Sequence, residues 1–588
     1  MILWINLRRT VTLSPRTTLS STTAPSTMAL IGLLLSLSFD FGGLRAAEQC
    51  VVAAVQPLAV DVGVDAFLQG GNAVDAAVAT ALTLGVVDNH NSGLGGGCFV
   101  LICQPDGTLV AIDGREKAPA AASRDMFVRN GKAQPELSTT GPLAVGVPGA
   151  LAAYALALEK CGERQLADLL LPAARIAERG FPIDAVYARK LSGKAAVLRQ
   201  FPGSRNALLK PDGTAYREGE ILRQPDLARS YHLMARHGPD WFYRGEFAQQ
   251  VARWMKANGG ILTAEDFANY QSVEREPLVT TYRDFQIVGF PPPSSGGVHV
   301  GQILSMLEQF PMAQEYANDP ATAQHLMIEA MKLAFADRAY WLGDADFAKV
   351  PRGLVDKSYC QSLAARIRRD ALAEVAQHGT PPRATSDLFG KHTTHIAAAD
   401  SAGYWVSITA TVNTAFGSKV IVPGSGIVLN NEMDDFSSQP GVPNAFDLIG
   451  AENNAVAPGK RPLSSMSPTI VLDDRDRPVL TLGAAGGPKI ITQVVQAIVR
   501  RLDYGQSLSA AVAAPRLHHQ WRPNTVLAEE SLPVAVRTGL EKLGHEIKTI
   551  ESSGVTQAVA REPNGQMVGV HDPRVPGKVG YAQREATK

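Results

Sequence analysis

The stretch from residue 394 to residue 412 reads THIAAADSAGYWVSITATV. Residues 394–399 and 404–412 are short runs rich in apolar and β-branched residues, and Asp-Ser-Ala-Gly at 400–403 is a turn sequence. This pattern predicts a β-hairpin. The preceding residues 377–392 are rich in Pro, Gly and polar residues, which predicts an exposed loop. Thr393 therefore stands where a flexible loop ends and a hairpin begins.

Segments on both sides of this junction predict a mixed helix and sheet protein. Residues 72–82 form a small-residue helix whose alanines permit close packing on a sheet, and Gly93–Gly97 precedes an apolar strand at 98–102 with a return strand at 109–113. A further strand at 285–290 leads into the proline-rich turn 291–297. Long helical stretches are predicted at 146–200, 224–258 and 318–376.

Composition narrows the class of ligand. The chain has 588 residues, with 56 Lys plus Arg balancing 56 Asp plus Glu. The net charge therefore gives no overall electrostatic field that would favour binding of nucleic acid, an anionic membrane or an acidic polymer. A small substrate held by local charges fits better. The cysteines show no CxxC or zinc-finger spacing, and we expect them mainly as buried small apolar residues. They are Cys50, Cys98, Cys103, Cys161 and Cys360.

The N-terminus predicts export. Residues 29–39 form an apolar run of signal-peptide length after Arg8, Arg9 and Arg16, and Leu44-Arg45-Ala46-Ala47 offers an imperfect cleavage site. The run is short for a membrane span, so an uncleaved anchor is the second interpretation. A periplasmic or secreted location follows.

Threonine at a cleavable loop–strand junction suggests a specific chemistry. Its hydroxyl is a weak nucleophile, but the α-amino group of an N-terminal threonine can act as its base. That amine exists only if the bond between His392 and Thr393 is broken, which Thr393 can do through an N→O acyl shift followed by hydrolysis. The alternative is an ordinary structural role for Thr393, because Thr-Thr pairs at the start of a strand usually pack against neighbouring residues or act as caps.

Several motifs in order resemble the γ-glutamyltransferase family, from about residue 49 to residue 582. Each motif is weak alone, but their number and order make a strong signal. The matching segments are 71–77 (GNAVDAA), 91–97 (NSGLGGG), 113–119 (DGREKAP), 291–297 (PPPSSGG), 393–395 (TTH), 411–417 (TVNTAFG), 429–436 (LNNEMDDF), 461–468 (RPLSSMSP) and Gly486-Gly487.

The resemblance implies a fold and an activity. The fold is α+β, a four-layer αββα sandwich of the N-terminal-nucleophile hydrolase type. Residues 1–47 are an extension and signal peptide, 48–392 the large subunit and 393–588 the small subunit of one heterodimer. The reaction is γ-glutamyl transfer from glutathione and related compounds to amino acids, peptides or water, through a γ-glutamyl ester on Thr393. No cofactor, metal or nucleic acid is implied.

The resemblance also implies roles for the matching residues. Thr393 resembles the autoprocessing nucleophile, and Thr411 the threonine that supports it. Three residues resemble the pocket for the glutamyl α-carboxylate: Arg115, Ser464 and Ser465. Three others resemble the groups that hold its α-amino group: Asn413, Glu432 and Asp435. The backbone N–H groups of Gly486 and Gly487 resemble the oxyanion hole.

Physical chemistry supports this division. An arginine fork with two hydroxyl donors suits a carboxylate, and two acidic side chains with an amide oxygen suit an ammonium group. Adjacent glycines let backbone donors approach a developing oxyanion.

Other interpretations of these residues remain open at this point. Arg115 alone suggests a surface salt bridge, and Ser464-Ser465 and Gly486-Gly487 could be ordinary turns. Gly93–Gly97 fails the dinucleotide motif, because Cys98 occupies its last glycine position. Adjacent His518 and His519 diverge in any regular structure, so we interpret them as structural.

Two rival functions are open as well. A glutaryl-cephalosporin acylase need not keep Asn413, Glu432 and Asp435, because a glutaryl group lacks the α-amino group. A processed but inactive binding protein for γ-glutamyl compounds need not keep Thr393, Thr411 and Gly486-Gly487. All of these residues are present.

The chain departs from the family's pattern at three places. Glu432 stands where some members have Gln, and His392 precedes the expected cut. Residues 440–450 resemble a lid loop, with Phe446 where relatives often place tyrosine. We therefore hypothesise a lid that lacks a latching hydroxyl and opens more readily.

Overall fold

Two stacked antiparallel sheets form the centre of the fold. The computed structural model describes residues 48–382 and 394–584. Strand order in the larger sheet is β20 (Lys578–Arg584), β1 (Glu48–Ala54), β11 (His395–Ala399), β12 (Trp405–Thr411), β2 (Gly97–Cys103), β3 (Leu109–Gly114) and β8 (Val273–Arg275). The six-stranded sheet has the order β19 (Met567–Val570), β18 (Val555–Arg561), β14 (Pro478–Ala485), β13 (Thr469–Leu472), β10 (Phe285–Gly289) and β9 (Leu278–Tyr282).

Apolar side chains fill the space between the sheets. Alternate residues of β1, β2, β11 and β12 meet those of β10, β13 and β18 in one buried cluster. Phe99 of β2 stacks on Phe290, just beyond β10, with ring centroids 4.1 Å apart. This packing holds the ends of the strands in fixed positions.

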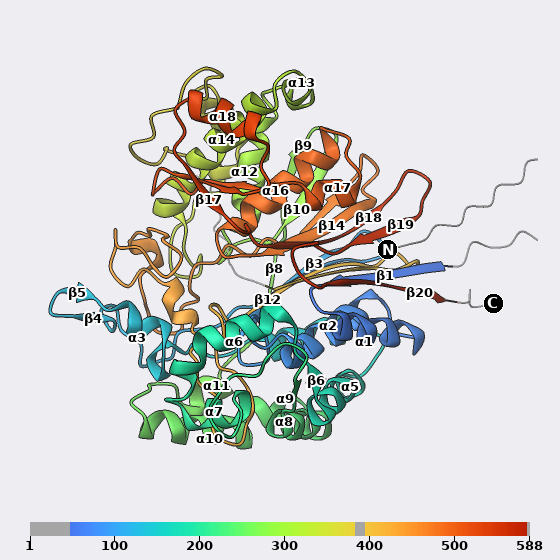
Figure 1. Cartoon of the computed structure of the whole chain (residues 1–588), viewed down its shortest axis with the longest axis vertical. Coiled ribbons are helices and arrows are strands. Elements are labelled where there is room, and N and C mark those ends of the chain that lie inside the picture. The colour runs from blue at the N-terminus through green and yellow to red at the C-terminus, as the bar shows by residue number, and fades with distance from the viewer. Residues whose placement is uncertain (1–47, 383–393, 585–588) are drawn as a thin grey trace, which may run out of the picture. The chain divides into compact units, whose positions relative to one another are not determined.

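Helices cover the outer face of each sheet (Figure 1). The seven-stranded sheet is covered by α1 (Pro57–Leu68) and α2 (Ala73–Val87), with α4 (Ala150–Cys161), α5 (Leu166–Arg179), α6 (Ala185–Leu198), α8 (Pro225–His237) and α10 (Glu246–Ala257) around them. The six-stranded sheet is covered by α12 (Gly296–Leu307), α14 (Pro320–Trp341) and α16 (Lys489–Leu502). The predicted αββα architecture is confirmed.

Local sequence explains helix α2, which covers the larger sheet. Asn72 caps α2 by accepting from Val74 N (2.8 Å), and Asp75 returns the bond by accepting from Asn72 N (2.8 Å). Every residue of α2 is buried. Its small side chains allow close approach: a Cβ added at Gly63 of α1 would lie 2.3 Å from Thr80 Oγ1.

The predicted hairpin is confirmed as β11 and β12. His395 pairs with Thr409, and Ala399 pairs with Trp405. Asp400 closes the turn, since its Oδ1 accepts from Gly403 N (2.9 Å) and Tyr404 N (3.0 Å).

Segments before residue 383 and after residue 393 share both sheets. Strand β1 lies between β11 and β20, β12 pairs with β2, and β10 pairs with β13. The two segments are therefore held together by backbone hydrogen bonds along several strands.

One predicted helical stretch, 318–376, is wrong in extent. Helix α14 ends at Trp341, a 3-10 turn follows at Arg352–Val355, and α15 covers only Lys357–Ala364. Gly343 packs so closely that an added Cβ would lie 2.1 Å from Asn453 O, a tertiary contact that sequence periodicity does not reveal.

The cysteine prediction is confirmed, because all five cysteines are buried and none of them forms a disulfide. No helix within the described ranges has the length and apolar composition needed to cross a membrane. The predicted signal segment 29–39 and the predicted cut between His392 and Thr393 lie outside the described residues.

Candidate functional site

The end of β12 presents the first group of candidate residues. Thr411 is its last residue, and the Thr411 Oγ1 atom accepts a hydrogen bond from Asn413 N at 2.7 Å. Beside it, Ala410 N donates to Thr394 O (2.5 Å). The Thr411 hydroxyl keeps its own proton available to donate, since it acts here as an acceptor.

Asn413 follows in an uncommon backbone conformation. Its φ of 74° is left-handed, which asparagine tolerates better than most residues. The side-chain Nδ2 donates to Asn431 O (3.0 Å), which fixes the amide plane. Asn413 Oδ1 is buried and accepts no hydrogen bond from the described residues, so it is available as an acceptor.

Gly486 and Gly487 link β14 to α16. Their φ values are 138° and 62°, in the region that favours glycine. A Cβ at Gly487 would lie 2.8 Å from Phe446 Cδ1, so a side chain at this corner would require Phe446 to move. Both glycines, Thr411 and Asn413 line one cavity of about 550 Å³.

A buried charged cluster forms the second group. Arg115 follows β3 and is 0% exposed. Its guanidinium pairs with Glu432, with Asp435 (Nη2–Oδ2, 2.6 Å) and with Glu116 (Nη1–Oε2, 3.2 Å). The surface salt-bridge interpretation of Arg115 is therefore wrong.

Burial beside the guanidinium changes the protonation of Glu116 and Glu432. Burial raises the pKa of Glu116 to about 7, although Arg115 opposes the rise. Burial likewise raises the pKa of Glu432. Burial alone would lower the pKa of Arg115, but Glu432, Glu116 and Asp435 together raise it. The cluster thus holds a permanent cation and can store a proton.

The neighbouring acid does not enter this cluster. Asp434 Oδ1 accepts from Ser138 Oγ (2.6 Å), and its Oδ2 accepts from Ala445 N (3.1 Å). Of the acidic pair, only Asp435 contacts Arg115.

The two predicted serines lie beside a residue that the sequence analysis missed. Ser465 Oγ accepts from Arg338 Nη2 (3.1 Å), and Arg338 Nε donates to Ser295 Oγ (3.0 Å). Ser464 contributes its carbonyl to Ser295 N (3.0 Å). Arg338 and Asp435 line the same small cavity, which places the serines next to the charged cluster.

The structure thus brings the predicted residues together in two groups. Thr411, Asn413, Gly486 and Gly487 share the 550 Å³ cavity, whereas Arg115, Glu432 and Asp435 share ion pairs and do not line it. Asn431 connects the groups, since it accepts from Asn413 and directly precedes Glu432. Thr393 lies outside the described residues.

Glu116 was also missed as a site residue. Glu116 directly follows Arg115 within the motif at 113–119, but nothing in the residue spacing distinguished it from a solvent-exposed glutamate. Arg338 had no sequence signal, because only the fold brings α14 to the serines.

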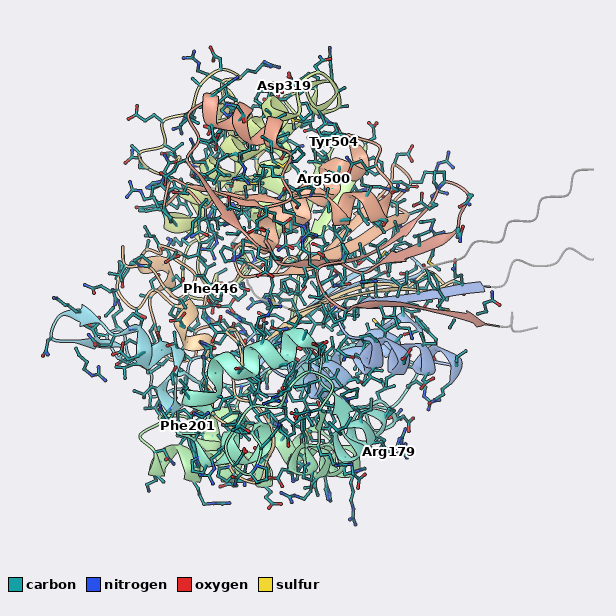
Figure 2. All side chains as sticks on the ribbon, in the orientation of Figure 1. Arg179, Phe201, Asp319, Phe446, Arg500 and Tyr504 are labelled. Carbon is teal, nitrogen blue, oxygen red and sulfur yellow. The ribbon has the colours of Figure 1, made fainter. Side chains whose placement is uncertain are left out.

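Phe446, labelled in Figure 2, belongs to the predicted lid loop and lines the 550 Å³ cavity. Asn444 Oδ1 accepts from Phe446 N (3.0 Å), and Gln520 Nε2 donates to Phe446 O (3.3 Å). The loop is therefore held by backbone contacts.

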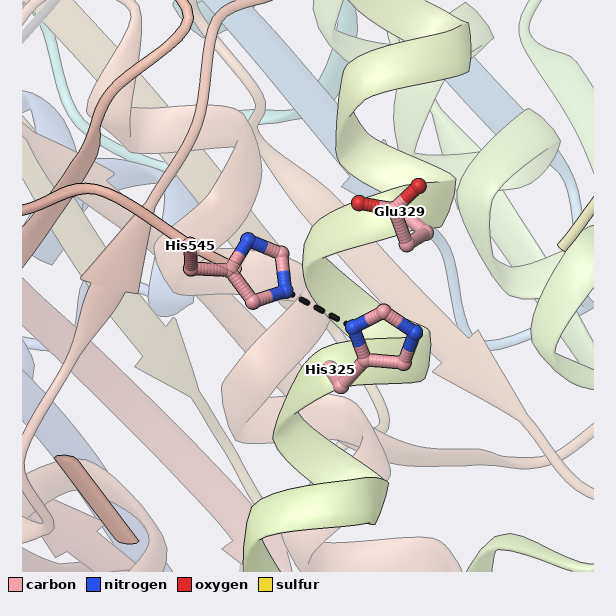
Figure 3. A group of neighbouring side chains, drawn as sticks. All are labelled: His325, Glu329 and His545. Carbon is pink, nitrogen blue, oxygen red and sulfur yellow. Dashed lines mark hydrogen bonds between the residues drawn. The ribbon is translucent and has the colours of Figure 1, made fainter. Parts of the chain in front are cut away.

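One cluster has the side chains of a metal site. Figure 3 shows His325 and Glu329 one turn apart on α14, facing His545. His325 Nδ1 and His545 Nε2 hydrogen-bond at 2.7 Å, while Glu329 pairs with Lys332 (2.8 Å) and accepts from Ala373 N (2.6 Å). The two histidines bond to each other and Glu329 has other partners, so we interpret the cluster as a structural link between α14 and the C-terminal segment.

The histidine pair at 518 and 519 has separate partners. His518 hydrogen-bonds with Thr492 (3.0 Å), and His519 with Asn524 (3.1 Å). We therefore keep the structural interpretation of both residues.

Comparison with known proteins gives consistent results. A family profile described as gamma-glutamyltranspeptidase matches residues 59–582. The glutathione hydrolase proenzyme of Escherichia coli (strain K12) is 42% identical over 530 residues, covering 90% of this chain and 91% of that protein.

Two solved structures are similar as well. The cephalosporin acylase from Bacillus halodurans has a TM-score of 0.80 and 29% identity, covering 93% of this chain and 99% of that one. The Helicobacter pylori gamma-glutamyltranspeptidase has a TM-score of 0.54 and 37% identity, covering 55% of this chain and 93% of that one.

Proposed function

This chain belongs to the γ-glutamyltranspeptidase family, and we propose that it moves γ-glutamyl groups from glutathione to water or amines using the two groups of residues described above. The charged cluster carries this proposal. A γ-glutamyl group ends in an α-carboxylate and an α-ammonium, and Arg115 with Glu432 and Asp435 offers both complementary charges in a buried place.

Thr393 is the proposed nucleophile, exposed as an N-terminal residue by cleavage after His392. The register of the hairpin supports the partner assigned to it: His395 pairs with Thr409, Thr394 contacts Ala410, and Thr411 is next. Residues 48–392 and 393–588 then form the large and small subunits. Their shared sheets would keep the cut chain together, and the Escherichia coli relative is also a proenzyme by name.

The proposed reaction has two steps. The Thr393 hydroxyl attacks the γ-carbonyl while its own α-amino group takes the proton. Gly486 and Gly487 donate backbone hydrogen bonds to the developing oxyanion, and Thr411 donates to the nucleophile oxygen. The proton passes to the leaving amine, leaving a γ-glutamyl ester that water or an acceptor amine then cleaves.

Substrate binding would exchange partners within the charged cluster. The α-carboxylate pairs with Arg115 beside Ser464 and Ser465, and the ammonium pairs with Glu432, Asp435 and the available Asn413 Oδ1. Because the protein's charges already compensate one another, the exchange conserves the number of ion pairs.

A cephalosporin-type acylase activity is the second candidate, favoured by the TM-score of 0.80 to such an enzyme. A glutaryl group carries no ammonium, so it would leave Glu432 and Asp435 without a new partner.

Export to the periplasm or outside the cell is the proposed location, with residues 1–47 as extension and signal. The apolar run 29–39 supports it. N-terminal sequencing of the exported protein tests it, and a mature protein retaining residues 29–39 would contradict cleavage.

Competing donors test the activity directly. We expect purified protein to release the amine from glutathione with kcat/KM roughly a hundredfold or more above that for a glutaryl amide of the same amine, since an unpaired buried charge costs several kcal/mol. Equal rates for the two donors would contradict recognition of the ammonium.

A further inference from the structure

The cavity beside the glycines is strongly basic. Four cations line it, namely Arg189, Lys190, Lys489 and Arg574, against the single carboxylate of Glu551. An excess of positive charge in a concave site favours an anionic ligand group.

Three of these cations already have polar partners. Arg189 pairs with Glu551 (3.4 Å), and Lys190 Nζ donates to Asn91 Oδ1 (2.7 Å). Arg574 occupies both carboxylate oxygens of Glu529, at 2.9 and 2.5 Å.

Lys489 differs from the others. Within residues 48–382 and 394–584, its ammonium group has no hydrogen-bond or ion-pair partner. Burial lowers its pKa, and the nearby negative charge of Glu529, already bound to Arg574, opposes this only in part. The side chain is half-buried and also lines a second cavity of about 650 Å³. A half-buried ammonium without a partner is a ready site for a carboxylate.

The position of Lys489 indicates which carboxylate of the substrate it would bind. Lys489 is two residues beyond Gly487, the proposed oxyanion donor. The charged groups proposed to hold the glutamyl end, Arg115, Glu432 and Asp435, are buried elsewhere and do not line this cavity. The part of the substrate beyond the scissile nitrogen therefore extends into the basic cavity. In glutathione this part ends in a carboxylate about 7 Å, or two residues, from that nitrogen.

We propose that Lys489 forms a subsite for the terminal carboxylate of the amine side, which is the cysteinylglycine part of glutathione and the carboxylate of dipeptide acceptors. This inference rests on the proposed function. Lys489 binds and positions the leaving group or acceptor, whereas bond cleavage belongs to Thr393 and the glycines.

Glutathione and its glycine carboxamide, which differ only in the carboxylate, test the subsite. For Lys489→Met we expect kcat/KM with glutathione to fall roughly tenfold, as for loss of one charged hydrogen bond, and to change less than about twofold with the carboxamide. Lys489→Arg should restore most of the glutathione rate. Cleavage of γ-glutamyl-4-nitroanilide, whose leaving group has no carboxylate, checks that the variant is folded.

Arg189→Met is the matched control, because Arg189 lines the same cavity but is paired with Glu551. It should leave the ratio of the two rates nearly unchanged. An equal fall for both substrates in Lys489→Met, no fall for either, or the same selective fall in Arg189→Met would overturn the assignment. Failure of the wild type to cleave any of the three substrates would instead contradict the proposed function.

Discussion

The charged cluster around Arg115 and the glycine corner at Gly486-Gly487 are built in opposite ways. In the cluster every proposed recognition group is a fully buried side chain that forms an ion pair within the protein. At the corner the groups are backbone atoms beside an open cavity. The cluster depends on compensation of charge, whereas the corner depends on the absence of a side chain.

This difference matches the two tasks proposed for these regions. Selecting a zwitterion requires charges that are already desolvated and paired. Stabilising an oxyanion requires fixed dipoles that can approach the reacting carbon closely. Substitutions in the two regions should therefore fail differently.

Arg115→Met should have the largest effect. It leaves the carboxyl groups of Glu116, Glu432 and Asp435 buried without their cation, which we expect to cost about 3–5 kcal/mol of unfolding free energy. The milder Arg115→Lys keeps the positive charge but loses the planar set of guanidinium donors. It should therefore fold, and its kcat/KM should fall roughly a hundredfold.

Thermal unfolding and donor kinetics measure both effects. Arg124→Met is the control, because Arg124 pairs with Glu452 at 2.9 Å on the surface and should change stability by less than about 1 kcal/mol. Similar losses for both arginines would show that the cluster is no different from a surface pair.

Gly487→Ala should have the second-largest effect, which is a decrease in kcat. The residue has φ 62°, and the new Cβ would approach Phe446 Cδ1 to 2.8 Å, so the corner must shift. Loss of one oxyanion donor costs about 2.7–4 kcal/mol, or roughly a hundredfold or more in kcat.

Gly441→Ala is the control that separates the steric clash of an added Cβ from the strain of a left-handed backbone. Gly441 has φ 82° but no atom within 4 Å of an added Cβ. It should lose a little stability and keep its kcat. A Gly487→Ala enzyme with unchanged kcat would remove this corner from the mechanism.

Glu116→Gln should have a smaller, pH-dependent effect. Burial holds the pKa of Glu116 at about 7, above its ordinary 4.5, so the folded state keeps a proton that the unfolded state releases. Stability from this group is full at low pH and is lost as the pH rises through about 7. The melting temperature of Glu116→Gln relative to wild type should therefore increase between about pH 5 and pH 8. A constant difference would contradict the proton-storing cluster.

Phe446→Tyr should have the smallest effect, about twofold or less in kcat. A new hydroxyl would latch the loop 440–450 and slow its opening, measurable by relaxation of labelled loop residues. Equal opening rates in the two proteins would reject the looser lid.

Sequence reasoning succeeded where the signal was local. The capping pair Asn72 and Asp75, and the alternating strands around Asp400, specify their elements within a few residues. The buried cluster is different, because Arg115 and Glu432 come from distant segments. Their grouping was predictable only through the family resemblance. That resemblance assigned no role to Arg338, Glu116 or Lys489.

Intact-mass spectrometry of wild type beside Thr393→Ala tests the central claim most directly. We predict two fragments in the wild type, the smaller beginning at Thr393, and a single uncut chain in the variant. A wild-type chain that stays uncut under folding conditions would remove the N-terminal amine from the reaction and contradict the proposed mechanism.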